Sequence, residues 1–278
     1  METAGGRADT LVFLATYNER PNIDGLLDLI LGLPIRCDIF AVDDNSPDGT
    51  AAALQRRATV DSRIFVLVRP TRLGIGSAHR LAWLYARRHG YARIVTLDAD
   101  RSHDPLDIPR LLRALDEGAD VALGSRFVVD GKLGYTGWRR VLSRSANGLA
   151  RILLGCQVAE YTNSFRAARL DRVPVGLIET IRNNGYGYFL AATVRMARSG
   201  LRLVEVPIHF QDRQSGKSKM PRSEILFGAA NLLRLALDRR RFGEANPQPP
   251  AACGACGQLY VVTTPPHRTQ CLACMTVG

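Results

Sequence analysis

Arg93-Ile94-Val95-Thr96-Leu97-Asp98-Ala99-Asp100 is the stretch that decides the fold prediction, because an apolar strand here ends in two carboxylates. A strand turns successive side chains to opposite faces, so Asp98 and Asp100 are expected to point the same way. Two hard oxygen ligands suit Mg²⁺ or Mn²⁺, which bind through one or two carboxylates plus substrate phosphates. The alternative interpretation is a pair of solvated turn residues before a helix that begins near Pro105.

Strands and helices alternate on both sides of this stretch. Apolar runs at 11–15, 39–42, 64–68, 94–97 and 121–123 predict strands, with helices from about Pro21, after a cap at Thr50, and through Arg88. This pattern is typical of an α/β protein whose mostly parallel sheet carries helices on both faces. The second half predicts helices at 138–154, 188–199 and 223–240, a strand at 201–206, and loops at 160–166 and 211–221.

Polar residues follow three of the predicted strands: Thr16-Tyr17-Asn18-Glu19, Asp43-Asp44-Asn45 and Asp98-Ala99-Asp100. Ligands of open α/β sheets bind at the carboxyl edge of the strands. A nucleotide lying there needs acceptors for base and ribose and a metal for its diphosphate. Asp and Asn also favour turns, so a single cluster decides nothing. Three clusters at successive strand ends favour the nucleotide site.

Gly74-Ile75-Gly76 resembles the start of a dinucleotide-binding fingerprint. His79 stands where the third glycine belongs, and the segment follows the third predicted strand instead of the first. We therefore reject a hydride-transfer function.

The charge of the chain predicts an anionic partner. The 278 residues carry a net charge of +11, and residues 182–242 hold twelve Arg and Lys against four Asp and Glu. Nucleic acid, an anionic membrane and a phosphorylated substrate all fit this excess. We find no signal-peptide pattern and no run of about 18–20 apolar residues. The chain is therefore expected in the cytoplasm, where cysteines serve as thiols or metal ligands.

Several segments in order resemble the motifs of family 2 glycosyltransferases, and within them those of the dolichol-phosphate and polyprenol-phosphate mannose synthases. The resemblance covers about residues 10–240. The matching segments are Ala15-Thr16-Tyr17-Asn18-Glu19-Arg20-Pro21-Asn22-Ile23, Val42-Asp43-Asp44-Asn45-Ser46-Pro47-Asp48-Gly49-Thr50, Arg72-Leu73-Gly74-Ile75-Gly76, residues 98–105, Gly124-Ser125-Arg126-Phe127, residues 138–147, residues 162–166 and residues 206–220.

The resemblance implies a GT-A fold and an inverting transfer of a hexose, mannose first, from a nucleotide-sugar, GDP-mannose first, to a polyprenyl or dolichyl phosphate. It also implies roles for individual residues. Asp98, Asp100 and Ser102 would bind Mg²⁺ or Mn²⁺, and Arg126, Arg139 and Ser143 the acceptor phosphate, which makes Asp98, Asp100 and Arg126 the catalytic set. The nucleotide-sugar would contact Thr16, Tyr17, Glu19, Asp43, Asp44, Arg72 and Asp98, with Arg213 and Lys219 closing over the diphosphate.

The chemistry agrees with this assignment independently. A phosphate monoester is mostly a dianion at neutral pH and needs no general base. The chain departs from the family pattern at Glu160 and Ser164, where Asp and Gly are usual, and at Phe189 and Ala191. These departures leave open a UDP-sugar donor or a soluble acceptor. A catalytically idle scaffold is the remaining alternative, and the intact aspartate pair argues against it.

The C-terminal part of the sequence predicts two further features. Ile225, Leu226, Ala229, Leu232, Leu233 and Leu237 lie among arginines in the predicted 223–240 helix, which either lies in an anionic membrane interface or packs on the catalytic domain. Cys253-x-x-Cys256 and Cys271-x-x-Cys274 predict a structural Zn²⁺ ribbon that docks a partner protein or staples the fold, with unrelated thiols or two disulfides as alternatives.

The predicted domains are a GT-A domain over 8–242, a linker over 243–250 and the ribbon over 251–278. Because Arg268 is the single basic residue of the ribbon, nucleic-acid binding is not expected.

Overall fold

A mixed sheet of seven strands forms the centre of the computed structural model, which describes residues 8–133, 138–211, 230, 232–237, 251–252 and 259–260. The strand order is β3-β2-β1-β4-β7-β5-β8. The bounds are β1 (Thr10–Thr16), β2 (Cys37–Asp43), β3 (Ile64–Val68), β4 (Arg93–Asp98), β5 (Val121–Ser125), β7 (Arg166–Arg169) and β8 (Leu203–Pro207). The strands predicted from the apolar runs are thereby confirmed.

One strand is missing from the sequence prediction. β7 lies between β4 and β5 and runs antiparallel to both. The loop predicted over 160–166 is present up to Phe165, and β7 begins at Arg166. The strand is short, and its four residues, Arg-Ala-Ala-Arg, include none of the β-branched or aromatic types that are common in strands. The central position of β7 in the sheet, and not its own propensity, makes it a strand. The remaining neighbours are parallel, so the sheet is mostly parallel as predicted.

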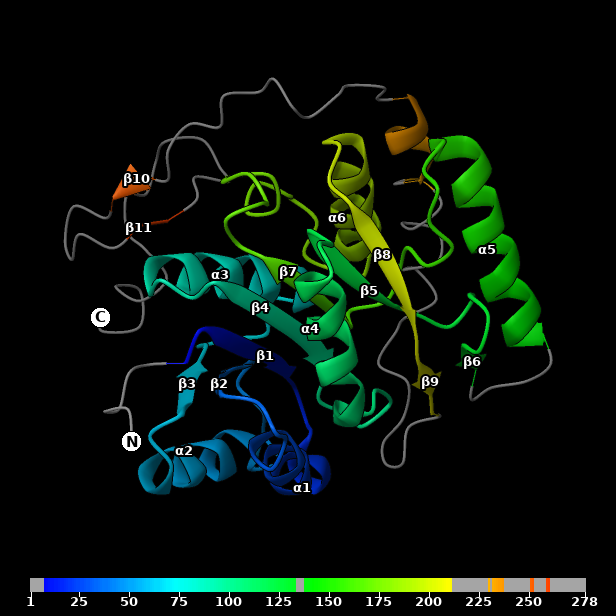
Figure 1. Ribbon diagram of the computed structural model, residues 1–278. Helices are drawn as coiled ribbons and strands as arrows, with labels where there is room; N and C mark the ends of the chain where they lie inside the picture. Colours follow the sequence, from blue (N-terminus) through cyan, green and yellow to red (C-terminus); the bar gives the residue numbers. More distant parts are fainter. Residues whose placement is uncertain are drawn as a thin grey trace.

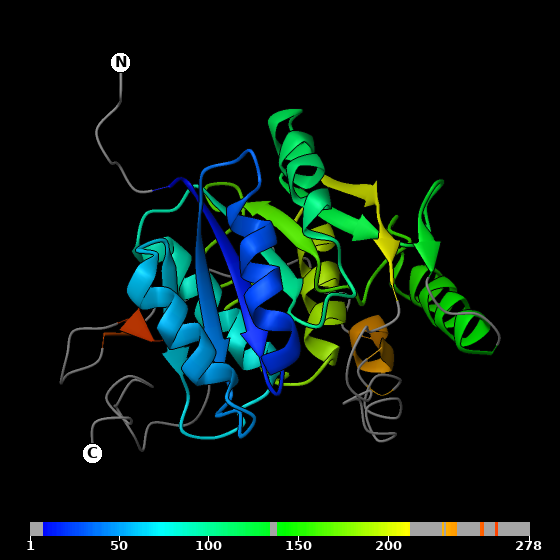
Figure 2. The same cartoon turned by 90° about the horizontal axis from the view of Figure 1, so that it is seen from below.

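Helices cover both faces of the sheet (Figures 1 and 2). α1 (Arg20–Leu31), α2 (Thr50–Val60) and α4 (Ile108–Asp116) pack on one face through a buried cluster that includes Leu26, Leu54 and Leu111. α3 (Ile75–Arg88), α6 (Gly187–Arg198) and the end of α5 (Trp138–Leu154) supply the cluster on the other face. The helix predicted at 138–154 coincides with α5.

Short elements complete the described chain. The 3-10 turn η1 (Pro105–Asp107) leads into α4, and β6 (Lys132–Leu133) pairs in parallel with β9 (His209–Phe210). β10 (Ala251–Ala252) and β11 (Leu259–Tyr260) form an antiparallel pair. Within the part of the chain that the structure describes, no helix has the length and apolar content that crossing a bilayer requires.

Of two other sequence predictions, the structure describes one in part and corrects the other. Residues 230 and 232–237 of the predicted 223–240 helix are helical, and the rest of it lies outside the described residues. Thr50 was expected to cap α2. Instead it is the first helical residue, and Gly49 precedes it with a φ of +88°. Gly49 is the residue that adopts this left-handed conformation without strain.

The sheet brings the ends of β1, β2 and β4 to one edge. β1 lies between the other two, with Thr16 in register with Asp43 and Ala15 in register with Asp98. Because all three strands are parallel, the loops after them open on the same side. Thr16, Asp43 and Asp98, three of the residues expected to bind the nucleotide or the metal, therefore lie at this edge.

Candidate active site

The loops that follow β1 and β2 are held together by hydrogen bonds. The Asn18 amide donates to Ser46 Oγ at 3.0 Å, and the Glu19 amide donates to Thr50 Oγ1 at 2.9 Å. Asn18 and Asn45 have φ values of +56° and +57°, a conformation that asparagine tolerates better than most residues. The two loops therefore form one rigid rim beside the strand ends.

The Asp43 carboxylate connects the two loops of this rim through hydrogen bonds. Its side chain is fully buried and accepts hydrogen bonds from Thr16 Oγ1 at 2.8 Å and from the Ser46 amide and Oγ at 2.8 and 2.6 Å. Glu19 is buried as well and accepts from Asn22 Nδ2 at 2.9 Å. Thr16 and Asp43 are thus in direct contact, and Glu19 lies in the adjoining loop, where its hydrogen bonds run to Thr50 and Asn22.

Asp44 has a partner that sequence reasoning missed. Arg69, which follows β3 and is 2% exposed, forms an ion pair with the Asp44 carboxylate. Arg69 also donates to Ser77 Oγ at 2.6 Å and to the Gly74 carbonyl at 3.1 Å, while the Gly74 amide donates to Asp44. Burial lowers the pKa of Arg69, and the adjacent Asp44 opposes that shift. The sequence signal that could have identified Arg69 is its position as a basic residue directly after the third strand.

Tyr17 and Arg72 meet at the opening of the same loops. The Arg72 guanidinium carbon lies 4.5 Å from the centre of the Tyr17 ring, in a cation–π contact. Tyr17 is half-buried and Arg72 is exposed. A planar cation and an aromatic ring are suited to a base or a phosphate, and the exposed Arg72 leaves this part of the predicted nucleotide site open to a ligand.

The glycines at the start of α3 have a packing explanation. A Cβ atom at Gly74 would lie 2.5 Å from the Asn184 carbonyl oxygen, and one at Gly76 would lie 2.4 Å from the Asn183 carbonyl oxygen. The Gly76 amide donates to the Asn184 carbonyl at 2.8 Å. Two segments more than a hundred residues apart therefore touch through backbone, which agrees with rejecting the dinucleotide fingerprint.

Asp98 closes β4 at the centre of this edge. Its carboxylate is 29% exposed, and Ser164 Oγ donates a hydrogen bond to its Oδ1 at 2.6 Å. The Asp98 amide donates to Nδ1 of the buried His103 at 3.2 Å. Desolvation lowers the pKa of His103, against the attraction of Asp98 and Asp100. The imidazole is therefore neutral and holds the turn after β4.

Asp100 lies in the turn that follows, and it is 4% exposed. Its Oδ1 accepts from the Ser102 amide at 3.1 Å and from Ser102 Oγ at 2.6 Å. Arg101 between them has a φ of +62°, an unusual conformation for a residue with a long side chain. The structure thus places Ser102, a predicted metal ligand, as a donor to the Asp100 carboxylate.

The donor set at this turn fits a hard divalent cation. It consists of two carboxylates and a hydroxyl, which are the ligand types that Mg²⁺ and Mn²⁺ prefer. Among the described residues, no group of three or more His, Cys, Asp and Glu side chains has metal-binding geometry. Two carboxylates and a hydroxyl match the small number of protein ligands that a phosphate-bound Mg²⁺ requires.

Arg126 follows β5 and lies near the same turn. It pairs with Glu160 through two hydrogen bonds, of 2.7 Å from Nε and 2.9 Å from Nη2. The Phe210 ring lies 4.9 Å from the Arg126 guanidinium carbon and 5.4 Å from the His103 ring. Phe210 therefore packs between Arg126, the residue predicted to bind the acceptor phosphate, and His103 in the turn that follows Asp98.

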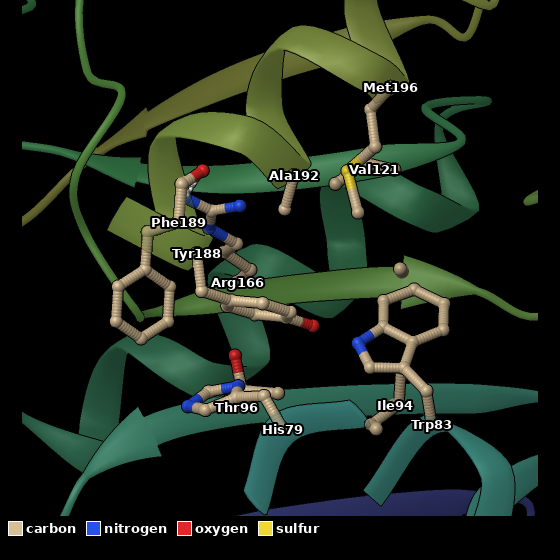
Figure 3. Close-up of a pocket in the computed structure, with 11 residues that line it drawn as sticks. His79, Trp83, Ile94, Thr96, Val121, Arg166, Tyr188, Phe189, Ala192 and Met196 are labelled. Carbon is tan, nitrogen blue, oxygen red and sulfur yellow. Dashed lines mark hydrogen bonds between the residues drawn. The ribbon is translucent and has the colours of Figure 1, made fainter. Parts of the chain in front are cut away.

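Beneath the site, Arg166 is buried in an aromatic cluster (Figure 3). Burial lowers the pKa of Arg166 to about 10 and the pKa of His79 to about 3. Arg166 donates to the carbonyls of Asn163, Tyr161 and Phe189 at 2.8, 3.2 and 3.1 Å. It is a second residue whose structural role the sequence did not reveal.

The remaining predicted site residues are not placed in detail. Arg139 and Ser143 lie on α5, whose side chains at these positions are not described. Arg213, Lys219 and the four cysteines Cys253, Cys256, Cys271 and Cys274 lie outside the described residues. Their assignments stay predictions.

Comparison with known proteins agrees with the fold and the motifs. Over 238 residues, the chain is 39% identical to polyprenol monophosphomannose synthase of Mycolicibacterium smegmatis, covering 84% of this chain and 90% of that protein. It is 36% identical to undecaprenyl-phosphate mannosyltransferase of Micrococcus luteus, covering 83% and 95%.

The fold also matches solved structures. A crystal structure of glucosyl-3-phosphoglycerate synthase from Mycobacterium tuberculosis superposes with a TM-score of 0.60 at 22% identity, covering 83% of this chain and 80% of the other. At this identity the likeness concerns the fold alone, a GT-A-like α/β fold. The model of the family described as glycosyl transferase family 2 matches residues 11–172. The chain thus belongs to glycosyl transferase family 2 and is a glycosyltransferase.

Proposed function

We propose that this glycosyltransferase transfers a mannosyl group from GDP-mannose to a polyprenyl phosphate, with inversion at the anomeric carbon. The observation that carries the proposal is the match to two relatives named for mannosyl transfer to lipid phosphates, each aligned over at least 90% of its own length. The arrangement of the site supports it, because a carboxylate-rich turn and a buried arginine occur together at one edge of the sheet.

The acceptor supplies its own nucleophile in this reaction. An oxygen of the phosphate dianion attacks the anomeric carbon, the bond to the nucleoside diphosphate breaks, and no proton has to be removed first. The protein has to align the two reactants and balance their charges. In the proposal, Arg126 binds the acceptor phosphate together with Arg139 and Ser143 from α5.

The donor would lie over the ends of β1, β2 and β4. The Tyr17–Arg72 pair contacts the nucleotide, while Thr16, Glu19, Asp43 and Asp44 hold the loops that receive it, and Arg213 and Lys219 cover the diphosphate. Asp98 and Asp100, supported by Ser102, would hold Mg²⁺ or Mn²⁺. The cation would neutralise charge on the leaving diphosphate.

Contact with a membrane surface follows from a lipid acceptor. Exposed apolar side chains on α5 and on residues 232–237 support it: Leu149, Ile152, Leu153, Leu233 and Leu237. Arg151 and Arg234, both exposed, suit anionic headgroups. We propose peripheral binding on the cytoplasmic face.

We also propose a Zn²⁺ ribbon of Cys253, Cys256, Cys271 and Cys274 over residues 251–278, joined by the 243–250 linker to the catalytic domain over 8–242. The strands β10 and β11 support it, because in the sequence they bracket the first cysteine pair. The ribbon would dock a protein partner or staple the C-terminus.

Sugar transfer to a short polyprenyl phosphate tests the function directly. GDP-mannose, UDP-glucose and UDP-GlcNAc are offered separately, each with Mg²⁺ and with EDTA. Labelling of the lipid from GDP-mannose that EDTA abolishes is the expected result. Labelling from a UDP-sugar would correct the donor. If all three donors leave the lipid unlabelled, the acceptor assignment is refuted and soluble acceptors take its place.

A further inference from the structure

We propose that the loop of residues 159–165 is a positioning element, in which Ser164 orients the Asp98 carboxylate and Glu160 orients the Arg126 guanidinium. The inference rests on the proposed function, because it takes Asp98 for the donor side and Arg126 for the acceptor side. The loop would thereby set the geometry in which the two reactants meet.

Ser164 is attached to β4 at two points. Its Oγ donates to Asp98 Oδ1 at 2.6 Å, and its carbonyl accepts from Thr96 Oγ1. A hydrogen bond to one carboxylate oxygen restricts the side-chain torsion, so the Asp98 carboxylate would meet the cation in one orientation. Partners of this kind are worth about 10–100-fold in metal affinity or activity. The family pattern has glycine here, which offers no such bond.

Glu160 performs the matching task for Arg126. It is 1% exposed and holds the guanidinium through both hydrogen bonds of a planar fork. Its own position is set by Glu205 on β8, which accepts from the Ala159 and Glu160 amides at 2.8 and 3.0 Å. A long arginine side chain held in one rotamer loses less entropy when it binds a phosphate.

The loop between these two residues is anchored to several elements. Asn163 Nδ2 donates to the Gly124 carbonyl at 2.7 Å, and the Tyr161 amide donates to Asn147 Oδ1 on α5 at 3.0 Å. Arg166 donates hydrogen bonds to the Tyr161 and Asn163 carbonyls. A shift of this loop would therefore move Asp98 and Arg126 together.

Two variants of the full chain test the proposal, and each is the matched control of the other. Mn²⁺ affinity is measured by electron paramagnetic resonance with GDP, and separately with UDP, in the absence of acceptor. KM for the polyprenyl phosphate is measured alongside. We expect Ser164→Ala to weaken Mn²⁺ binding about 10-fold with KM for the acceptor unchanged. Glu160→Gln is expected to raise that KM about 10-fold with Mn²⁺ affinity unchanged.

Conservative changes separate positioning from simple structural damage. Glu160→Asp keeps the carboxylate and is expected to recover part of the KM. If Glu160→Gln does not fold, Thr162→Val serves instead, because Thr162 Oγ1 donates to Glu160 at 3.1 Å and its loss should raise the same KM.

Unchanged Mn²⁺ affinity in Ser164→Ala, or equal shifts of both readouts in both variants, overturns the proposal. If the wild-type protein transfers no sugar to the lipid, the proposed function is refuted, and with it the inference that Glu160 orients Arg126 for the acceptor. The Mn²⁺ affinity of Ser164→Ala then still decides whether Ser164 orients the Asp98 carboxylate.

Discussion

The buried ion pair between Asp44 and Arg69 gives the sharpest test of how the donor-side loops are held. The Arg69 side chain is 2% exposed and that of Asp44 is 8% exposed, so solvent screens the pair little. Breaking a buried pair by removing one partner costs about 3–5 kcal/mol, because the other charge stays buried. Asp44→Asn and Arg69→Met are each expected to lose this much stability.

Urea unfolding followed by circular dichroism measures the loss. With an m-value of about 3 kcal/mol/M, each single variant moves the midpoint down by about 1–1.7 M. The double variant leaves no unpaired charge, so its loss should fall short of the sum by at least about 2 kcal/mol. Additive losses would refute the reasoning. Ser77→Ala, which removes one Arg69 contact of 2.6 Å and no charge, is the control.

Three further predictions follow from the site and its surroundings. Asp100→Asn is expected to abolish transfer while the free energy of unfolding stays within about 1 kcal/mol of wild type, and transfer at more than a tenth of the wild-type rate would contradict the metal assignment. Burial holds the pKa of His79 at about 3, below the ordinary histidine value of about 6.5, so the folded state keeps the imidazole neutral while the unfolded state takes up a proton below pH 6.5. Stability is then present above pH 6.5 and lost as the pH falls toward 3, by about 2 kcal/mol at pH 5; in His79→Phe, urea unfolding at pH 7 and pH 5 should show a smaller loss. Gly76→Ala is expected to destabilise the chain by about 2 kcal/mol or more, because the added Cβ would lie 2.4 Å from the Asn183 carbonyl oxygen; a midpoint equal to that of Gly148→Ala, where a Cβ meets open space, would contradict it.

Local pattern predicted much of the architecture. The strand before Asp98 is a short apolar run, and the helix at 138–154 is one continuous segment, so the sequence alone identifies both. β7 could not be found in this way. Its four residues have weak strand propensity, and it is a strand because two neighbours offer it unpaired backbone groups on both sides.

The candidate site also has features that the sequence alone predicts and features that only the tertiary structure shows. The sequence alone located the polar clusters after β1, β2 and β4, since chain order and strand polarity decide which edge they occupy. Only the tertiary structure brought Arg69 to Asp44, Glu160 to Arg126 and Ser164 to Asp98. Each of these pairs spans 25 to 66 residues of sequence. Residue types and their spacing thus determine which chemistry is present, whereas long-range pairing, which depends on the packing of the whole sheet, decides which charges are matched and how each side chain is aimed.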